Sequence, residues 1–280
     1  MRGRATGARV RARLWGSLGT LVLVVLAALI VPPLFGSGST VHYEAIRLPP
    51  GWAHPFGTDS SGRDLFVRSL AGLRISLLVA AISAVVSTVL GSAVGVAAGA
   101  LGGWSDRLLM RAVDAVNAVP HLLLGIVIVS LYRGSVVAVM LSIALTHWAT
   151  VARIVRSEVL SLRERPYIDA AISGGASRLR VLYRHFLPAV VPQAALSAVL
   201  LIPHAVWHET ALSFLGLGLP PHMASIGNIL GDGRSAVLLG AWWLILFPSL
   251  LLVATTLAVS GIAATWRDRV VPRRRSELSL

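Results

Sequence analysis

The sequence predicts an all-α integral membrane protein with about six transmembrane helices. Of its 280 residues, 55% are hydrophobic and only 13% are charged, whereas soluble domains carry roughly 25% charged residues. The mean hydropathy of +0.76 agrees with this composition. The excess of apolar surface requires lipid around it, so composition alone decides the class of protein.

Six long apolar runs are the candidate spans, since a spanning helix needs about 20 apolar residues. They cover residues 14–35, 73–101, 115–131, 135–150, 186–217 and 237–265. The third and fourth runs are short and close together. They form either two tight spans, which we favour, or a helical hairpin that enters from one side. The first run is longer than the apolar core of a signal peptide and is followed by no clear cleavage site, which predicts a retained span.

The positions of the arginines predict how the chain is oriented. All 25 basic residues are arginines, and most lie in the two tails and in alternate loops, which share one side of the membrane in a six-span chain. Because basic loops stay inside, both termini are predicted to be cytoplasmic. The predicted order is a cytoplasmic Arg-rich tail (1–13), a first transmembrane helix (14–35), an extracytoplasmic segment (36–70), a core of five further transmembrane helices (71–266) and a cytoplasmic basic tail (267–280).

Composition also excludes several classes of function. A net charge of +13 that is spread over loops on one side of a membrane reports topology and not a nucleic-acid-binding face. The absence of lysine excludes a Walker A loop and a Schiff-base lysine. The absence of cysteine excludes thiolate metal sites, iron–sulfur clusters and cysteine nucleophiles. We expect no cofactor, and no nucleotide hydrolysis through a P-loop of this chain.

The largest loop on the predicted inner side, residues 151–186, has a distinctive pattern. Pro166 suits the first turn of a short helix, and Gly174-Gly175 would end that helix about two turns later. The small residues between them would let the backbone of another protein approach closely. On helix pattern alone, an ordinary solvated loop is the alternative.

The spacing within this loop resembles the EAA loop of binding-protein-dependent ABC transporter permeases. It reads Asp169-Ala-Ala, three residues, Gly175, and nine residues before His185-Phe-Leu-Pro188. Asp169 replaces the family's Glu and keeps its carboxylate, whereas His185 replaces Ile. The resemblance implies that this short helix docks into a groove on an ATPase subunit and transmits its motion. The residues to which it assigns this coupling role are Tyr167, Asp169, Ala170, Ala171, Gly174, Gly175, Ala176, Leu187 and Pro188.

Further segments narrow the resemblance to the dipeptide, oligopeptide and nickel branch of these permeases, and to its second, C-type subunit. They are residues 54–64, 74–78, 114–120, 209–221 and 226–232, whereas residues 261–268 depart from the branch's usual C-terminal run. The implied fold is that of a type I ABC importer permease in a bacterial cell membrane. The implied function is half of a translocation path for small peptides, or for nickel or metal chelates.

The resemblance also implies the partners of the chain. They are a homologous second permease subunit in a heterodimer, two ATP-binding ABC subunits that hydrolyse ATP, and an extracytoplasmic solute-binding protein, all at a lipid bilayer and without nucleic acid. ATP binding would switch the path from inward-open to outward-open, and only contacts that differ between the two states can drive that change.

Three polar residues in the fifth apolar run are candidates for lining the translocation path. His204 and His208 are four residues apart and share one helical face, while Glu209 lies about 100° further round. Such groups inside a span usually face a cavity or a partner. The alternatives are a structural anchor and the handling of a transition metal, which imidazole and carboxylate groups would suit. We assign no metal ligand.

Two other features are interpreted as structural. Gly91, Gly95 and Gly99 are spaced by four residues, which predicts a close contact between helices. His147-Trp148, at the inner end of the fourth run, predicts an interfacial anchor.

Two other classes of function remain as alternatives. An intramembrane metalloenzyme would use His204, His208 and Glu209, but their order differs from the His-Glu-x-x-His motif of zinc proteases. A stand-alone secondary transporter would show an internal repeat, which we do not detect. Copurification with ATPase subunits would distinguish the importer from both.

Overall fold

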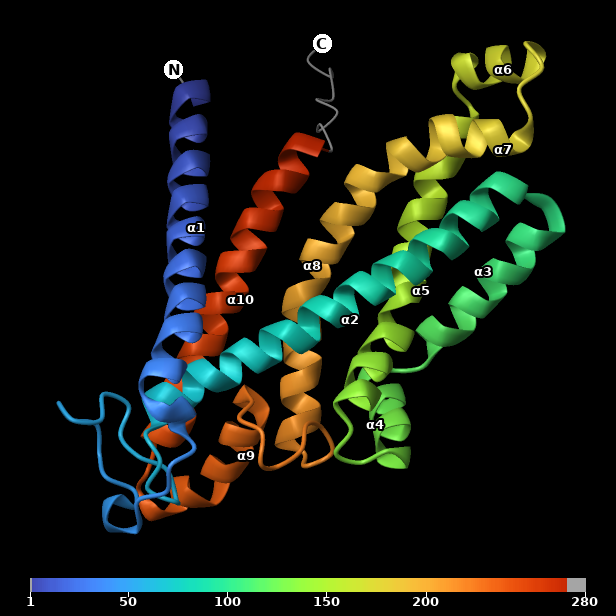
Figure 1. Cartoon of the computed structure of the whole chain (residues 1–280). Coiled ribbons are helices and arrows are strands. Elements are labelled where there is room, and N and C mark those ends of the chain that lie inside the picture. Colours follow the sequence, from blue (N-terminus) through green and yellow to red (C-terminus); the bar gives the residue numbers. More distant parts are fainter. Residues whose placement is uncertain (1, 271–280) are drawn as a thin grey trace.

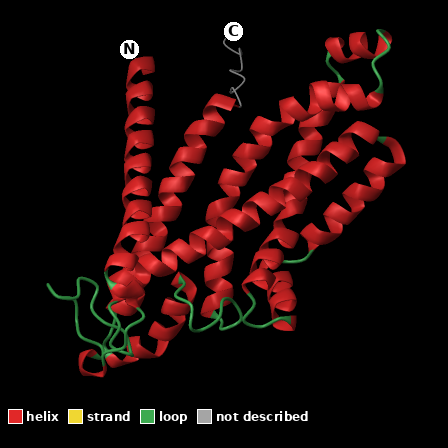
Figure 2. Cartoon of the chain, viewed as in Figure 1, coloured by secondary structure: helices red, strands yellow, loops and turns green. Residues whose placement is uncertain are grey.

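The structure is a computed structural model that describes residues 2–270, and the described residues form helices and loops without a β-strand (Figures 1 and 2). The longer helices are α1 (Arg2–Leu34), α2 (Leu65–Leu101), α3 (Gly103–Ala118), α4 (His121–Leu131), α5 (Val136–Arg163), α8 (Leu187–Phe214), α9 (Ile226–Ala236) and α10 (Trp243–Val270). The shorter elements are η1 (Gly36–Gly38), η2 (Tyr43–Ala45), α6 (Pro166–Ser173), α7 (Arg178–Val181), the π-turn η3 (Leu182–Phe186) and η4 (Val237–Leu239). From position 271 onward, the predicted basic tail lies outside the described residues.

Five helical stretches are long and apolar enough to cross a membrane. They are Arg11–Leu34, Leu65–Leu101, Val136–Arg163, Arg178–Phe214 and Trp243–Asp268. α3 and α4 form a sixth candidate only as a pair, because they are bent by 86° relative to each other. The prediction of an all-α membrane protein with about six spans is confirmed.

The third predicted run, 115–131, is not one straight helix, because the chain breaks at Pro120. The proline ring disfavours helical geometry in the residue before it, and Val119 is extended (φ −90°, ψ 131°). α4 starts afresh at His121 and contains 11 residues, which gives about 16 Å of helix at about 1.5 Å per residue. That length is about half of the hydrocarbon core of a bilayer, so α4 does not span alone.

The helices lie side by side, and the two ends of the bundle differ (Figure 1). One end carries α6 and α7, the start of α1 and the close of α10, and we call it the α6 end. The other end carries α9 and the loops between α1 and α2, and we call it the α9 end. α2 crosses the bundle obliquely and packs mainly on α5 and α8, whereas α1 packs mainly on α10.

The glycine ladder of α2 lies against α5, as predicted. A methyl group on Gly91 would lie 2.5 Å from the carbonyl oxygen of Trp148, and one on Gly95 would lie 2.5 Å from that of Ala152. A methyl group on Gly99 would instead lie 2.7 Å from Cβ of Val159, further along α5. Small residues let the two backbones approach closely, and α2 and α5 form the most extensive helix pair in the described part of the chain.

Candidate functional site

The predicted coupling loop, 151–186, is shorter in the structure, because α5 continues to Arg163 and a helical stretch resumes at Arg178. Within the remaining segment, residues 166–173 form a short helix, α6, that projects from the α6 end (Figure 1). α6 begins at Pro166 and ends at Ser173. Proline suits the first turn of a helix because backbone N–H groups there have no partner within the helix, so the N–H that proline lacks is not missed. Gly174 donates its backbone N–H to the carbonyl oxygen of Ala170, and Gly175 turns the chain with a φ of +85°. The sequence therefore predicted the bounds of this helix.

One buried side chain holds α6 to the rest of the protein. Ile168 is 2% exposed and belongs to an apolar cluster with Val159, Val181 and Phe186. Ile168 was not in the predicted coupling set, whose members are more open. Tyr167, Asp169, Ala170, Gly174, Gly175 and Pro188 are exposed, and Ala171, Ala176 and Leu187 are half-buried. α6 thus presents a carboxylate, an aromatic ring and small residues at the tip of the bundle.

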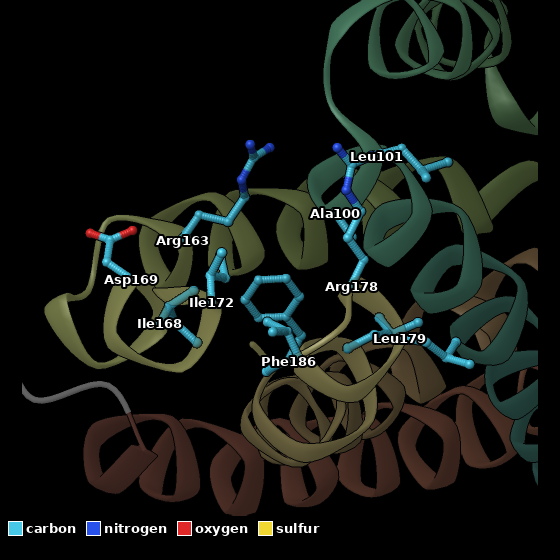
Figure 3. Close-up of a pocket in the computed structure, with 12 residues that line it drawn as sticks. Ala100, Leu101, Arg163, Ile168, Asp169, Ile172, Arg178, Leu179 and Phe186 are labelled. Atoms are coloured by element: carbon cyan, nitrogen blue, oxygen red, sulfur yellow. The ribbon is translucent and has the colours of Figure 1, made fainter. Parts of the chain in front are cut away.

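A cavity of about 600 Å³ separates α6 from the end of α2 and from α7. Figure 3 shows Ile168 and Phe186 on its apolar wall and the side chains of Arg163 and Arg178 at its rim. Arg163 donates a hydrogen bond of 2.9 Å to the carbonyl oxygen of Gly99 at the end of α2.

The three polar candidates of α8 do not share one environment. His204 is exposed and His208 is half-buried, and both line a groove of about 430 Å³ between α8 and α10. Glu209 faces away from this groove. It is fully buried near Ser76 of α2, and one of its carboxylate oxygens accepts a hydrogen bond of 2.8 Å from Ser213 Oγ. The structure therefore brings the two histidines together and separates Glu209 from them.

Three histidines from three helices meet inside the bundle. The ring centroid of His147 in α5 lies 4.6 Å from that of His208 and 5.0 Å from that of His121 in α4. His147 is 5% exposed, and its Nδ1 lies 2.9 Å from the carbonyl oxygen of Ile143. In the neutral ring Nδ1 therefore carries the hydrogen, and Nε2 is left as an acceptor. The prediction of His147 as an interfacial anchor is wrong, because side chains of α4 and α8 pack against it inside the bundle.

The sequence reasoning missed His121 and His147 as members of this cluster. The sequence did contain an indication of the cluster. Ionisable residues are rare inside spans, yet three successive apolar runs each contain at least one histidine. Within the described residues, no group of three His, Cys, Asp or Glu side chains is arranged to hold a metal ion. The cluster offers hydrogen-bond donors and acceptors inside the bundle, where the buried hydroxyl of Thr146 also lies 2.9 Å from His147 Nδ1.

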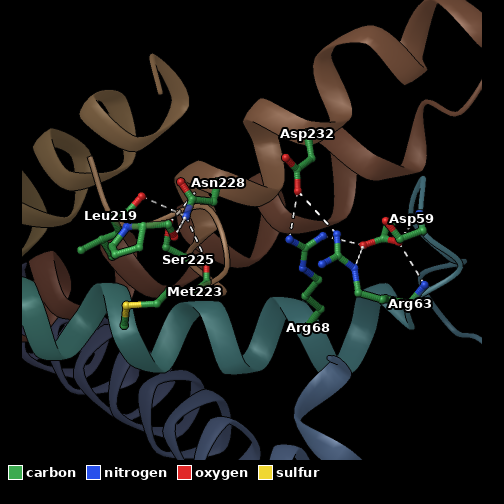
Figure 4. Close-up of polar contacts among 10 residues, drawn as sticks. Asp59, Arg63, Arg68, Leu219, Met223, Ser225, Asn228 and Asp232 are labelled. Atoms are coloured by element: carbon green, nitrogen blue, oxygen red, sulfur yellow. Dashed lines mark hydrogen bonds and ion pairs between the residues drawn. The ribbon is translucent and has the colours of Figure 1, made fainter. Parts of the chain in front are cut away.

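A partly buried charge network closes the α9 end (Figure 4). Arg68 of α2 is 3% exposed and binds both Asp59 and, at 2.9 Å, Asp232 of α9. Arg63 adds a bond of 2.7 Å to Asp59. The side-chain N–H groups of Asn228 donate hydrogen bonds to three carbonyl oxygens of the loop before α9, those of Leu219, Pro220 and Met223. Two of the segments that carry the family resemblance, 54–64 and 226–232, therefore fold onto each other.

Comparison with known proteins agrees with this architecture. Residues 91–276 match the family model described as binding-protein-dependent transport system inner membrane component. A putative peptide permease protein of Brucella suis biovar 1 is 38% identical over 267 residues, which cover 94% of this chain and 87% of that protein. The oligopeptide transport system permease protein OppC of Escherichia coli K12 is 39% identical over 263 residues, which cover 92% of this chain and 86% of that protein.

The region that matches the family model begins within α2 and includes α5, α6 and α8. It therefore contains both the projecting helix and the histidine cluster. The two relatives are named as permeases, which are transport components and not enzymes. The chain belongs to the binding-protein-dependent transport system inner membrane components, and it is a multi-pass permease subunit of an ABC transporter in the branch that includes the oligopeptide permeases.

Proposed function

We propose that this chain is one of two permease subunits of an ATP-driven importer of peptides, and that α6 is its contact with an ATPase subunit. The observation that carries the proposal is the geometry of α6. It stands clear of the bundle, is anchored by the buried Ile168, and exposes Tyr167, Asp169 and Ala170. Only Ile168 is committed to the chain's own core, so the rest of the helix surface is open for docking into a groove of a second protein. The names of the two relatives support a peptide as the substrate.

The α6 end is proposed to face the cytoplasm, where the ATPase subunits lie. The start of α1, the close of α10 and α6 share this end (Figure 1). The arginines of the chain concentrate in the same segments, which favours the inner side of the membrane for them. The α9 end would then face the solute-binding protein on the outside.

The translocation path is proposed to form between this chain and a homologous second permease. His204 and His208 supply polar groups to an open groove of α8, which supports a path-lining role. The complete burial of Glu209 and its bond from Ser213 support the anchoring role instead for that residue. Each permease would present one projecting helix, so two permeases would engage two ATPase subunits.

Nickel or a metal chelate is the less supported substrate. The described residues hold no three-residue group that is arranged for a metal ion, and the two relatives are named for peptides. Ligand-stimulated ATPase activity of the reconstituted complex separates these substrates, each supplied through its binding protein. Stimulation by a dipeptide panel supports the proposal, whereas stimulation only by nickel or nickel–histidine contradicts it.

A pair of matched glycine substitutions tests the role of α6. Gly175 and Gly134 both have positive φ, +85° and +71°, and a side chain would meet nothing within 4 Å at either position. Gly175→Val and Gly134→Val therefore impose the same kind of backbone strain, which costs about 1–2 kcal/mol for a residue forced into the left-handed region. Only Gly175 lies beside α6, whereas Gly134 lies in the turn between α4 and α5.

Uptake of a labelled dipeptide and copurification of the ATPase subunits are measured for both variants, after equal membrane insertion has been verified. We expect Gly175→Val to lose both uptake and ATPase association, and Gly134→Val to keep them. Unchanged association in Gly175→Val, or equal losses in the two variants, would remove the assignment of α6 as the contact.

A further inference from the structure

A basic pocket of about 240 Å³ lies at the α9 end, between the close of α1, the first turns of α2 and the loop before α9. Its polar lining consists of Arg63, Arg68, Arg74, His222 and Ser39. The proposed transport cycle does not use this pocket, which lies on a different part of the bundle from the groove between α8 and α10.

The charges in this pocket do not balance. Arg63 and Arg68 are paired with Asp59 and Asp232 in the charge network of the α9 end (Figure 4). Arg74 is exposed, and no described residue forms an ion pair or hydrogen bond with it. The pocket therefore carries one positive charge that the described part of the chain leaves unpaired.

The pocket lies at the level where the apolar parts of α1 and α2 meet their polar ends. Pro32 lines it at the point where the apolar run of α1 ends. Arg74 and Ile75 line it at the point where the long apolar run of α2 begins. Only 11% of the most apolar stretch of α1 is buried inside the protein. The pocket thus opens beside an apolar surface, at the level where spans meet the headgroups of a bilayer.

We propose that this basic pocket binds the phosphate group of an anionic phospholipid, with Arg74 as the main contact. A guanidinium group offers several N–H donors in a planar fork, which matches the oxygen atoms of a phosphate. The half-buried Ile75 would contact the upper part of an acyl chain. An acidic side chain of a protein partner has the same charge, but the apolar wall beside Arg74 favours a ligand that is partly hydrocarbon. The proposal requires only that the helices cross a bilayer, so it stands apart from the peptide substrate.

The test counts the phosphatidylglycerol molecules that remain with the purified complex of permeases and ATPases, by native mass spectrometry. Arg74→Gln removes the unpaired charge, and Arg74→Lys keeps a charge at the same place. Arg133→Gln is the matched control, because Arg133 is also exposed and lies in the turn between α4 and α5, outside the pocket. The attraction of one basic side chain to an anionic surface corresponds to about a fivefold difference in binding. We therefore expect lipid retention to fall about fivefold in Arg74→Gln, and much less in Arg74→Lys and Arg133→Gln.

A second arm distinguishes a lipid from free phosphate. Thermal stability of the delipidated complex is measured with added phosphatidylglycerol, phosphatidylcholine or inorganic phosphate. We expect stabilisation by phosphatidylglycerol alone, and its loss in Arg74→Gln. Equal retention in Arg74→Gln and Arg133→Gln would overturn the proposal, as would equal stabilisation by inorganic phosphate. A defect of Arg74→Gln only in stimulation by the solute-binding protein would also overturn it, in favour of an acidic protein partner.

Discussion

The close approach of α2 and α5 gives the most quantitative prediction, for the substitution Gly95→Ala. The new methyl group would lie 2.5 Å from the carbonyl oxygen of Ala152 and 2.9 Å from Cβ of Val155. Carbon atoms pack at about 3.5–4.0 Å, so the helices must separate locally by about 1 Å. Overpacking of this kind costs about 1–3 kcal/mol, against which alanine gains up to about 1 kcal/mol in helix propensity over glycine.

Gly125→Ala provides the control for this substitution. Gly125 is also a buried helical glycine, in α4, but a methyl group there would lie 3.8 Å from the nearest side-chain atom, in Leu212. We expect this variant to be as stable as the original chain or slightly more stable.

Thermal unfolding of the purified complex measures both variants, by the fraction that remains monodisperse after heating. A loss of 1 kcal/mol corresponds to about 2–4 °C in Tm for a chain of about this size, so Gly95→Ala should unfold several degrees lower than Gly125→Ala. Equal Tm values would refute the account of the α2–α5 contact.

Two further predictions concern the charged and polar residues. Arg68→Met should destabilise the complex by about 3–5 kcal/mol, because it removes a buried partner of the buried carboxylate of Asp59. Arg63→Met should cost less, because Arg63 is more exposed. Equal losses of the two variants in thermal unfolding would contradict the central role of Arg68. Changing His204 and His208 together to Ala should lower peptide uptake by about fivefold or more, since each lost hydrogen bond costs about 1 kcal/mol. Association with the ATPase subunits should be kept. Unchanged uptake would show that the two histidines do not line the path.

Local chemistry made much of the α6 end predictable. Proline and glycine restrict the backbone themselves, so Pro166 and Gly174-Gly175 were enough to place both ends of α6. The glycine ladder was predictable for a related reason, because regular spacing by four places small residues on one face of a helix whatever its partner is.

Features that depend on which helices pack together were not predictable from the sequence. The histidine cluster needs α4, α5 and α8 to converge, and nothing local to His121 or His147 specifies their partner helices. The bond between Arg68 and Asp232 joins residues that are 164 positions apart. The environment of Glu209 was not predictable for the same reason. Its position on the face of α8 followed from the sequence, but the packing of α2 against that face did not.

The most direct test of the proposed function uses the absence of cysteine in the chain. A single cysteine is introduced at Asp169, which is exposed on α6, or at Thr40, which is exposed in the segment between α1 and α2. A reagent that joins a thiol to nearby amines is then applied to the assembled complex, and the linked proteins are identified. We predict that Asp169→Cys is linked to an ATPase subunit and Thr40→Cys is not. Linkage of the ATPase from Thr40→Cys, or its absence from Asp169→Cys when the complex is intact, would contradict α6 as the contact that couples ATP hydrolysis to transport.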